Sequence, residues 1–267
     1  MSPLTSTNKR KTLHDYFQRD NRVNAKAHEQ VSSGNVVESS GSSTVKTFAN
    51  PAGLTLLHDF ITEEEEARLL DYLDRQHWRT DLARRTMHFG GTYCLLPPRD
   101  SSPATRKKFE GTILTAPDMP RDLDFLMEKM IASGLYEVDR RPEYCIVNEY
   151  RPGQGISAHV ENFRFGEPVC SLTLGGGDQM RFHELEAAHD GSVRSGKAST
   201  APRTGRREDV FLPRRSLVVL RSDARSKWQH EIVRGRKGGK PSGWRRVSLT
   251  FRVEVHEGVR GRKPVRE

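Results

Sequence analysis

Residues 148–161 read Asn-Glu-Tyr-Arg-Pro-Gly-Gln-Gly-Ile-Ser-Ala-His-Val-Glu, and the fold and the candidate site are both interpreted from this stretch. His159 and Glu161 are separated by one residue, so on an extended strand both side chains point to the same face. His230 lies well downstream, at the end of a strand-like run. Two imidazoles and one carboxylate can occupy one face of an octahedral iron and leave three positions open. His159, Glu161 and His230 are therefore candidate metal ligands. Taken alone, the His-x-Glu pair is a weak signal, and the alternative is that each histidine is an ordinary surface or core residue.

The sequence pattern around this stretch predicts two helices followed by short strands. Thr62 and Glu65 form a capping-box signature ahead of an apolar stripe that ends near Trp78. A second helix is predicted over residues 121–132, ending at Gly134. The clearest strands, separated by Gly and Pro turns, are 143–150, 168–174, 210–221 and 246–255. The sequence thus predicts an α+β fold with a β-sandwich or barrel-like core.

The last predicted strand has one apolar and one polar face. Its apolar residues are Val247, Leu249, Phe251 and Val253, and the alternate positions are Arg246, Ser248, Thr250 and Arg252. Guanidinium groups on a polar strand face beside a metal are well suited to binding a dicarboxylate. The alternative is a solvated arginine face on an ordinary sheet.

Composition divides the chain into a folded domain and two polar ends. Residues 1–49 are poor in apolar side chains and include a Ser/Gly-rich run, which predicts a disordered arm. We expect the folded domain to span 50–256, with a polar insertion loop at 184–209, and a basic tail to span 257–267.

The charge balance favours an anionic partner. The chain of 267 residues is 30% charged and has a net charge of +9, which indicates nucleic acid first and an acidic membrane surface second. Its 3 cysteines are too few for a disulfide framework. There is no run of roughly 18 apolar residues and no apolar signal-peptide core. We expect a soluble, intracellular protein with no membrane partner.

Several short motifs occur in a specific order. They are Asn-x-Tyr-x-x-Gly at 148–153, His-x-acid at 159–161, Ser-Leu-x-Leu-Gly at 171–175, Trp-x-His at 228–230, and two arginines separated by five residues, Arg246 and Arg252. Together they resemble the AlkB family of Fe(II)- and 2-oxoglutarate-dependent dioxygenases, from about Leu57 to Val253. The resemblance implies a double-stranded β-helix (jelly-roll) core, with the N-terminal helices packed on one sheet.

The resemblance also implies residue roles. It makes His159, Glu161 and His230 the Fe(II) ligands, and it implies 2-oxoglutarate contacts from Asn148, Tyr150, Arg246 and Arg252. Arg246 would hold the distal carboxylate, while Arg252 and Asn148 would help to place the end that chelates iron. The family normally has Asp where this chain has Glu161. The extra methylene means that the Glu161 carboxylate must fold back to reach the metal.

A nucleic-acid substrate would need stacking side chains and cations around the iron. A flipped-out base must be stacked within reach of the metal, with its backbone held by positive charge. Core packing is the alternative role for the aromatic residues. The segment 82–90 resembles the substrate-facing loop of the family. The candidate substrate residues are Arg84, Arg85, Phe89, Tyr93, Phe163 and Phe165.

The N-terminal arm contains one short candidate binding motif, at residues 9–17. Leu13, Tyr16 and Phe17 lie at i, i+3 and i+4 and would form an apolar plug on a short helical turn. With the basic run 9–11 before it, this segment resembles the motif with which proteins dock on the sliding clamp PCNA. Arg10 stands where that motif usually has Gln. The alternative is an incidental amphipathic turn. The same basic run resembles a nuclear import signal, so we expect a nuclear location.

These observations predict an oxygenase that demethylates alkylated nucleobases during DNA repair, with DNA favoured over RNA. Oxygen-dependent hydroxylation of an N-methyl group, coupled to conversion of 2-oxoglutarate to succinate, would release formaldehyde. The alternatives are a tRNA- or RNA-modifying oxygenase, a protein-demethylating oxygenase, and a catalytically silent nucleic-acid-binding adaptor docked on PCNA.

Overall fold

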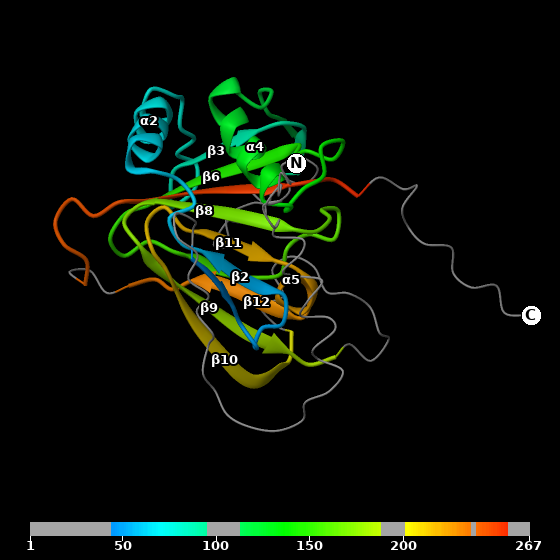
Figure 1. Ribbon diagram of the computed structural model, residues 1–267. Coiled ribbons are helices and arrows are strands. Elements are labelled where there is room, and N and C mark those ends of the chain that lie inside the picture. Colours follow the sequence, from blue (N-terminus) through cyan, green and yellow to red (C-terminus); the bar gives the residue numbers. More distant parts are fainter. Residues whose placement is uncertain (1–43, 95–112, 188–200, 236–238, 256–267) are drawn as a thin grey trace, which may run out of the picture.

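Two antiparallel sheets stacked face to face form the centre of the molecule (Figure 1). The computed structural model describes residues 44–94, 113–187, 201–235 and 239–255. The larger sheet has the spatial order β1 (Val45–Thr47), β2 (Leu54–Leu57), β11 (Leu217–Leu220), β8 (Val169–Gly175), β13 (Arg246–Arg252), β6 (Tyr144–Tyr150) and β3 (Thr86–Phe89). The smaller sheet has the order β10 (Arg203–Leu212), β9 (Asp178–Leu185), β12 (Trp228–Ile232) and β7 (Ile156–His159). A separate hairpin pairs β4 (Thr92–Cys94) with β5 (Ile113–Thr115).

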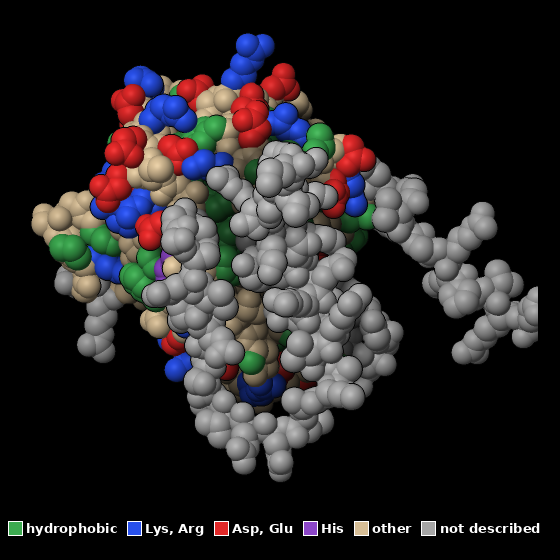
Figure 2. Space-filling view, in the orientation of Figure 1, with side chains coloured by type: hydrophobic (Ala, Val, Ile, Leu, Met, Phe, Trp, Pro, Cys, Tyr) green, Lys and Arg blue, Asp and Glu red, His purple; other side chains and the backbone are tan. Residues whose placement is uncertain are grey.

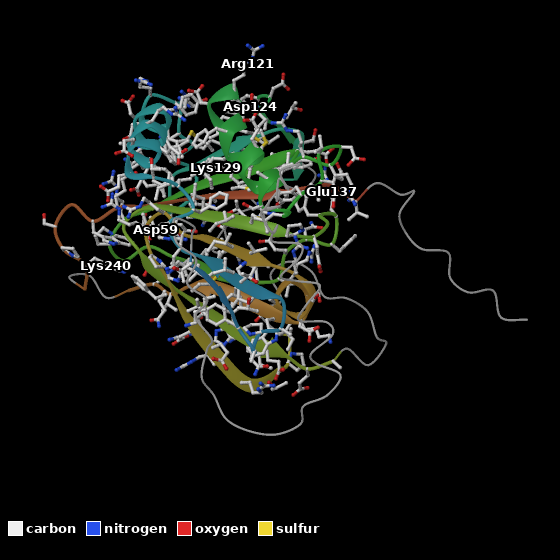
Figure 3. All side chains as sticks on the ribbon, viewed as in Figure 1. Asp59, Arg121, Asp124, Lys129, Glu137 and Lys240 are labelled. Atoms are coloured by element: carbon white, nitrogen blue, oxygen red, sulfur yellow. The ribbon has the colours of Figure 1, made fainter. Side chains whose placement is uncertain are left out.

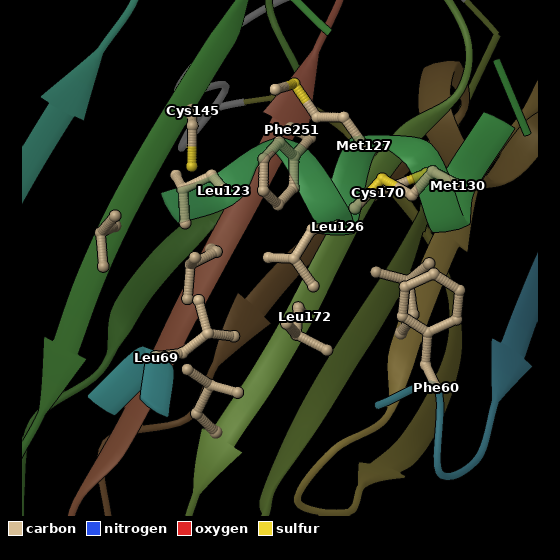
Figure 4. Packing of buried hydrophobic residues seen from close by; sticks show 14 of the residues in the cluster. Phe60, Leu69, Leu123, Leu126, Met127, Met130, Cys145, Cys170, Leu172 and Phe251 are labelled. Carbon is tan, nitrogen blue, oxygen red and sulfur yellow. The ribbon is translucent and has the colours of Figure 1, made fainter. Parts of the chain in front are cut away.

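Helices lie on the face of the larger sheet that is turned away from the smaller one (Figure 1). They are α2 (Glu63–Asp74) and the 3-10 turn η1 (Arg121–Leu123), which continues as α4 (Asp124–Ala132); a short helix, α5 (Ser222–Ser226), precedes β12. Buried residues of α2 and α4 belong to one apolar cluster with the strands beneath them (Figure 4). That cluster includes Leu69, Leu123, Leu126, Met130, Leu172 and Phe251.

Local sequence explains where the helices begin and end. At the start of α2, Thr62 and Glu65 each accept a hydrogen bond from the other's backbone, as the capping box predicts. The helix ends at Asp74, earlier than expected, and the Trp78 indole donates a hydrogen bond to the Leu73 carbonyl. Gly134 follows α4 with a φ of 70°, the left-handed conformation that glycine adopts readily after a helix.

A second apolar cluster fills the space between the two sheets. It joins Leu56 and Val218 of the larger sheet to Phe182, Leu212 and Trp228 of the smaller sheet. The larger sheet therefore contributes to apolar clusters on both of its faces, and the second of these clusters is shared with the smaller sheet. This arrangement explains why the strands of the larger sheet are almost continuously buried.

Three of the four predicted strands are confirmed, and the fourth is wrong. The segments 143–150, 168–174 and 246–255 correspond to β6, β8 and β13. The segment 210–221 instead holds the end of β10, a turn at Pro213–Ser216, and β11. Arg215 in this turn has a φ of 63°, so the chain reverses there and the two halves enter different sheets.

Two predicted boundaries also need correction. The expected insertion loop at 184–209 begins inside β9 and ends inside β10, and only 188–200 lies outside the described residues. β10 lacks apolar periodicity because it is an edge strand whose first residues are exposed. The arm expected at 1–49 is too long, because β1 pairs with β2 and begins the larger sheet. Residues 1–43 lie outside the described part of the chain.

The surface around the helices is charged with both signs. Acidic and basic side chains are interspersed over the α2 and α4 end of the molecule (Figure 2). Arg121 and Asp124 lie at the outer side of this layer (Figure 3), and Lys129 pairs with Glu65. Among the described residues, no helix combines the length and the apolarity needed to cross a membrane.

Candidate active site

Two histidines and one carboxylate meet in the smaller sheet, on the side that faces the larger one. His159 on β7 and His230 on β12 are paired directly across the two strands, and their ring centroids are 4.4 Å apart. The Glu161 Oε1 atom lies 3.4 Å from His230 Nε2 and 3.9 Å from His159 Nε2. One ligand atom from each of the three side chains lies within 4.8 Å of the others. The structure thus brings together the three residues predicted as metal ligands.

Hydrogen bonds and charge prepare this set to bind a cation. His159 Nδ1 lies 2.9 Å from the Ser157 carbonyl, a contact that places the proton on Nδ1 and leaves Nε2 as the donor to a metal. Burial lowers the pKa of His159 to about 4, and His230 adds to this shift. Burial disfavours the charged form of Glu161, but Arg252 and a hydrogen bond from His230 outweigh it and hold the Glu161 pKa well below its ordinary value.

Two imidazoles and one carboxylate are a donor set that suits a divalent transition metal. The extra methylene of Glu161, compared with Asp, does not remove its carboxylate from the two histidines, since Glu161 Oε1 lies 3.4 Å from His230 Nε2 and 3.9 Å from His159 Nε2. The residues present therefore fit Fe(II).

Arg252 explains how the Glu161 carboxylate is held. The guanidinium donates from Nε to Glu161 Oε2 at 2.8 Å and from NH2 to Glu161 Oε1 at 3.1 Å. Both side chains are buried, and the ion pair raises the pKa of Arg252 in spite of its burial. The resemblance implied a 2-oxoglutarate contact for this arginine. In the structure Arg252 lines the same pocket as the metal ligands, and it donates hydrogen bonds to the Glu161 carboxylate and to the Thr250 carbonyl.

Arg246 is a buried cation whose donors are incompletely used. Its NH2 donates to Thr173 Oγ1 at 3.0 Å, and its guanidinium carbon lies 5.1 Å from the centre of the Tyr150 ring. Among the described residues, no partner satisfies Nε or NH1, although the side chain is 1% exposed. Burial lowers the Arg246 pKa. Leaving a buried cation unpaired is costly, so this residue fits the carboxylate of a small anion.

A pocket between the sheets connects Arg246 with the metal ligands. Polar side chains line it from β6, β8 and β13 and from the three metal ligands, and apolar side chains line it from strands of both sheets. Asn148 and Tyr150, both predicted to contact 2-oxoglutarate, line it. The remaining lining residues are Ile156, His159, Glu161, Val169, Ser171, Met180, Val218, Leu220, His230, Ile232, Arg246, Ser248, Thr250 and Arg252.

Several polar residues that line the pocket or contact its lining residues were not predicted. Thr173, which holds Arg246, and Ser171 were missed, and Ser248 and Thr250 were noted only as positions on the polar face. The signal was present in the alternation of β13, because Arg246, Ser248 and Thr250 share one face. For β8 the signal was absent, since both of its faces are buried.

The predicted substrate residues fall on two different sides of the sheet. Arg85 pairs with buried Glu149 and stacks on Trp78, and Phe89 is part of the cluster beneath the helices. Neither lines the pocket between the two sheets, and their roles as substrate contacts stay predictions. β3 alternates its side chains between the two faces, and Phe89 lies on the helix side.

The other four predicted substrate residues make different contacts. Arg84 donates from Nε to Asn148 Oδ1 at 2.8 Å. Tyr93 is buried, and its hydroxyl donates to the Phe89 carbonyl. Phe165 packs edge-on against Tyr144. The PCNA-like residues Leu13, Tyr16 and Phe17 lie outside the described part of the chain.

Phe163 alone among the predicted aromatic contacts is exposed, at 63%. The loop that carries it is tied down on both sides. Arg225 NH2 donates to the carbonyls of Asn162 and Phe165, and Arg164 Nε pairs with Glu254 Oε1 at 2.7 Å. The loop therefore presents Phe163 at a fixed position, two residues after Glu161.

Comparison with known proteins gives a consistent result. Residues 53–252 match the profile of the family described as the 2OG-Fe(II) oxygenase superfamily. The chain is 30% identical over 200 residues to the Arabidopsis thaliana alkylated DNA repair protein ALKBH8 homolog, covering 71% of this chain and 53% of that protein. It is 29% identical over 207 residues to the Macaca fascicularis tRNA (carboxymethyluridine(34)-5-O)-methyltransferase ALKBH8, covering 74% of this chain and 27% of that protein. The chain thus spans about half of the first relative and about a quarter of the second.

Among solved structures, that of OsALKBH1 superposes with a TM-score of 0.52 at 17% sequence identity, covering 77% of this chain and all of that chain. At this identity the similarity concerns the fold alone. It agrees with the two stacked antiparallel sheets described above and with a jelly-roll core.

Proposed function

The chain belongs to the 2OG-Fe(II) oxygenase superfamily, and on that premise we propose that it oxidatively demethylates alkylated bases in DNA. Fe(II) and 2-oxoglutarate, when bound, supply oxygen-dependent hydroxylation of a C–H bond, coupled to the conversion of 2-oxoglutarate to succinate and CO2. On an N-methyl group the hydroxylated product is a hemiaminal, which breaks its C–N bond to give formaldehyde and the free base nitrogen.

The residues divide the work of holding the two cofactors. His159, Glu161 and His230 hold the metal, and Arg252 keeps the Glu161 carboxylate ionised and oriented towards it. Arg246 binds the distal carboxylate of 2-oxoglutarate with the nitrogens that lack a protein partner. Asn148 and Tyr150 line the space between them. The buried walls of the pocket exclude water from the reacting groups.

The position of Phe163 is the main observation in favour of a nucleobase as the substrate. An exposed aromatic side chain on an anchored loop, two residues after a metal ligand, offers a stacking surface for a base removed from its helix. The net charge of +9 favours the same class of anionic substrate. AlkB-like relatives named for nucleic-acid modification support it as well.

The activity is tested with single-stranded DNA that contains 1-methyladenine, incubated with Fe(II), 2-oxoglutarate and oxygen. We expect equal amounts of formaldehyde and succinate, and the loss of both with the His159→Ala variant. A Phe163→Ala variant should raise the KM for DNA several-fold, since stacking on one aromatic contributes about 1–3 kcal/mol. Succinate without formaldehyde from any methylated DNA would contradict the proposed substrate but not the oxygenase.

RNA is the second candidate substrate. It is favoured by the relative named as a tRNA methyltransferase and by the order His-Val-acid, Phe-Gly and Ser-Leu in this chain, which resembles the tRNA-hydroxylating branch of the family. A parallel assay with unmodified, carboxymethylated and methylated tRNA separates the two. Product from tRNA at a kcat/KM above that for methylated DNA would transfer the proposal to RNA.

We further propose that residues 10–17 dock the protein on PCNA and that it works in the nucleus. The proposal rests on the spacing of Leu13, Tyr16 and Phe17 after a basic run. A labelled peptide of residues 5–22 should bind PCNA with a micromolar Kd that is lost when Tyr16 and Phe17 are both changed to alanine. Equal binding of the two peptides would contradict the motif.

A further inference from the structure

Arg84 reaches from the segment before β3 to a residue of the cofactor pocket. Its Nε donates to Asn148 Oδ1 at 2.8 Å, and its guanidinium carbon lies 6.0 Å from the centre of the Tyr150 ring. Asn148 and Tyr150 both line the pocket. Within the described residues Arg84 forms no ion pair with an acidic side chain, so the Asn148 amide is its principal polar partner.

This contact decides how the Asn148 side chain is oriented. A guanidinium has five donors and no acceptor, whereas an Asn amide has an acceptor oxygen and a donor NH2 that can exchange places by a flip. With Arg84 on one side, only the oxygen can face it. The NH2 group is then directed away from Arg84, where it can donate to an oxygen of a ligand in the pocket. A flipped amide would set two donors against each other.

The neighbouring residue, Arg85, shows that the contact is specific to one position. Arg85 pairs with Glu149 Oε2 at 2.6 Å, and the Glu149 backbone N–H donates to the Arg85 carbonyl. Asn148 and Glu149 are consecutive residues of β6, so their side chains point to opposite faces of the sheet. Their partners Arg84 and Arg85 therefore lie on opposite faces as well. Two adjacent arginines thus have distinct tasks: one supports the pocket and the other supports the layer beneath the helices.

We propose that Arg84 is a positioning residue for 2-oxoglutarate, acting through Asn148. By holding the amide oxygen it presents the Asn148 NH2 to a carboxylate or keto oxygen of the co-substrate. The inference rests on the superfamily's co-substrate and on Asn148, and it is independent of whether DNA or RNA is oxidised.

The test measures binding without turnover. Isothermal calorimetry with Mn(II) in place of Fe(II), and without nucleic acid, gives the Kd for 2-oxoglutarate. Arg84→Ala should raise this Kd about tenfold, which corresponds to about 1.4 kcal/mol, because the Asn148 amide is then free to turn its NH2 away from the co-substrate. Arg84→Lys, which also has only donors, should recover part of the affinity. Arg84→Met, an apolar replacement of similar length, should behave like alanine.

Two further variants separate positioning from folding. Arg85→Ala should lower the Tm, because Glu149 is buried and loses a partner, yet leave the Kd for 2-oxoglutarate unchanged. In an Asn148→Ala background, Arg84→Ala should have no further effect on the Kd. The inference is overturned if Arg84→Ala and Arg85→Ala change the Kd equally, or if the effects of Arg84→Ala and Asn148→Ala are additive.

Discussion

Replacing Arg246 with methionine is expected to raise the Kd for 2-oxoglutarate at least 100-fold while leaving the protein without ligand as stable as before, or more stable. Removal of one partner from a buried charge pair costs about 2–5 kcal/mol, and each 1.4 kcal/mol is a factor of ten. In the free protein, however, Arg246 is a buried cation with Nε and NH1 unsatisfied. Methionine fills a similar volume and removes that cost. The expected result is therefore a loss of binding without a loss of folding.

Calorimetric titration with 2-oxoglutarate and thermal melting of the free protein measure these two effects separately. Arg245→Met is the matched control. Arg245 precedes Arg246 on the chain but points to the opposite side, where it binds Asp74. The control should lower the Tm and leave the Kd for 2-oxoglutarate unchanged. A large fall in the Tm of Arg246→Met, with little change in the Kd, would show that Arg246 is structural.

Replacing His159 with alanine is expected to abolish succinate production. Loss of residues that merely support metal ligands lowers metal affinity or activity about 10–100-fold, and loss of a ligand should exceed this range. The variant leaves only two of the three ligands, Glu161 and His230, to hold the metal. The measurement is Fe(II) bound per protein, together with succinate formed per minute.

His183→Ala provides the control for this variant. His183 lies on β9, next to Phe182, which is the residue paired with His230 on β12. The His183 Nε2 atom contacts Glu231 Oε1 at 2.9 Å. Its side chain points away from the pocket, so its loss should leave both iron content and succinate production intact. Iron content that falls equally in both variants would contradict the assignment of the metal site.

The sequence predicted which residue types form the site better than it predicted which residues each side chain contacts. The alternation in 246–252 correctly placed Arg246, Ser248 and Thr250 on one face, because the period of a strand is fixed by backbone geometry. The pairing of Arg252 with Glu161 joins residues 91 positions apart, and local pattern contains no information on such a contact. For the same reason the sequence could not tell that Arg84 contacts Asn148 while Arg85 contacts Glu149.

The fold was predicted where strands are buried and missed where they lie at an edge. β8 and β13 are central strands with apolar residues at alternate or successive positions, and both were found. β10 begins with Arg203, and its exposed first half carries polar residues on both faces. It reads as a loop because an edge strand needs no apolar partner on its outer side. The turn at Pro213–Ser216 was missed because apolar residues on both sides of it resemble one continuous strand.

The central claim is that His159, Glu161 and His230 hold the metal and that Arg246 holds 2-oxoglutarate. A crystal structure of the protein grown with Mn(II) and 2-oxoglutarate, with anomalous data collected for manganese, tests it most directly. The account predicts one strong anomalous peak bonded to these three side chains, with a carboxylate of 2-oxoglutarate bonded to Arg246. A peak bonded to other residues, or 2-oxoglutarate bound without any contact to Arg246, would contradict it.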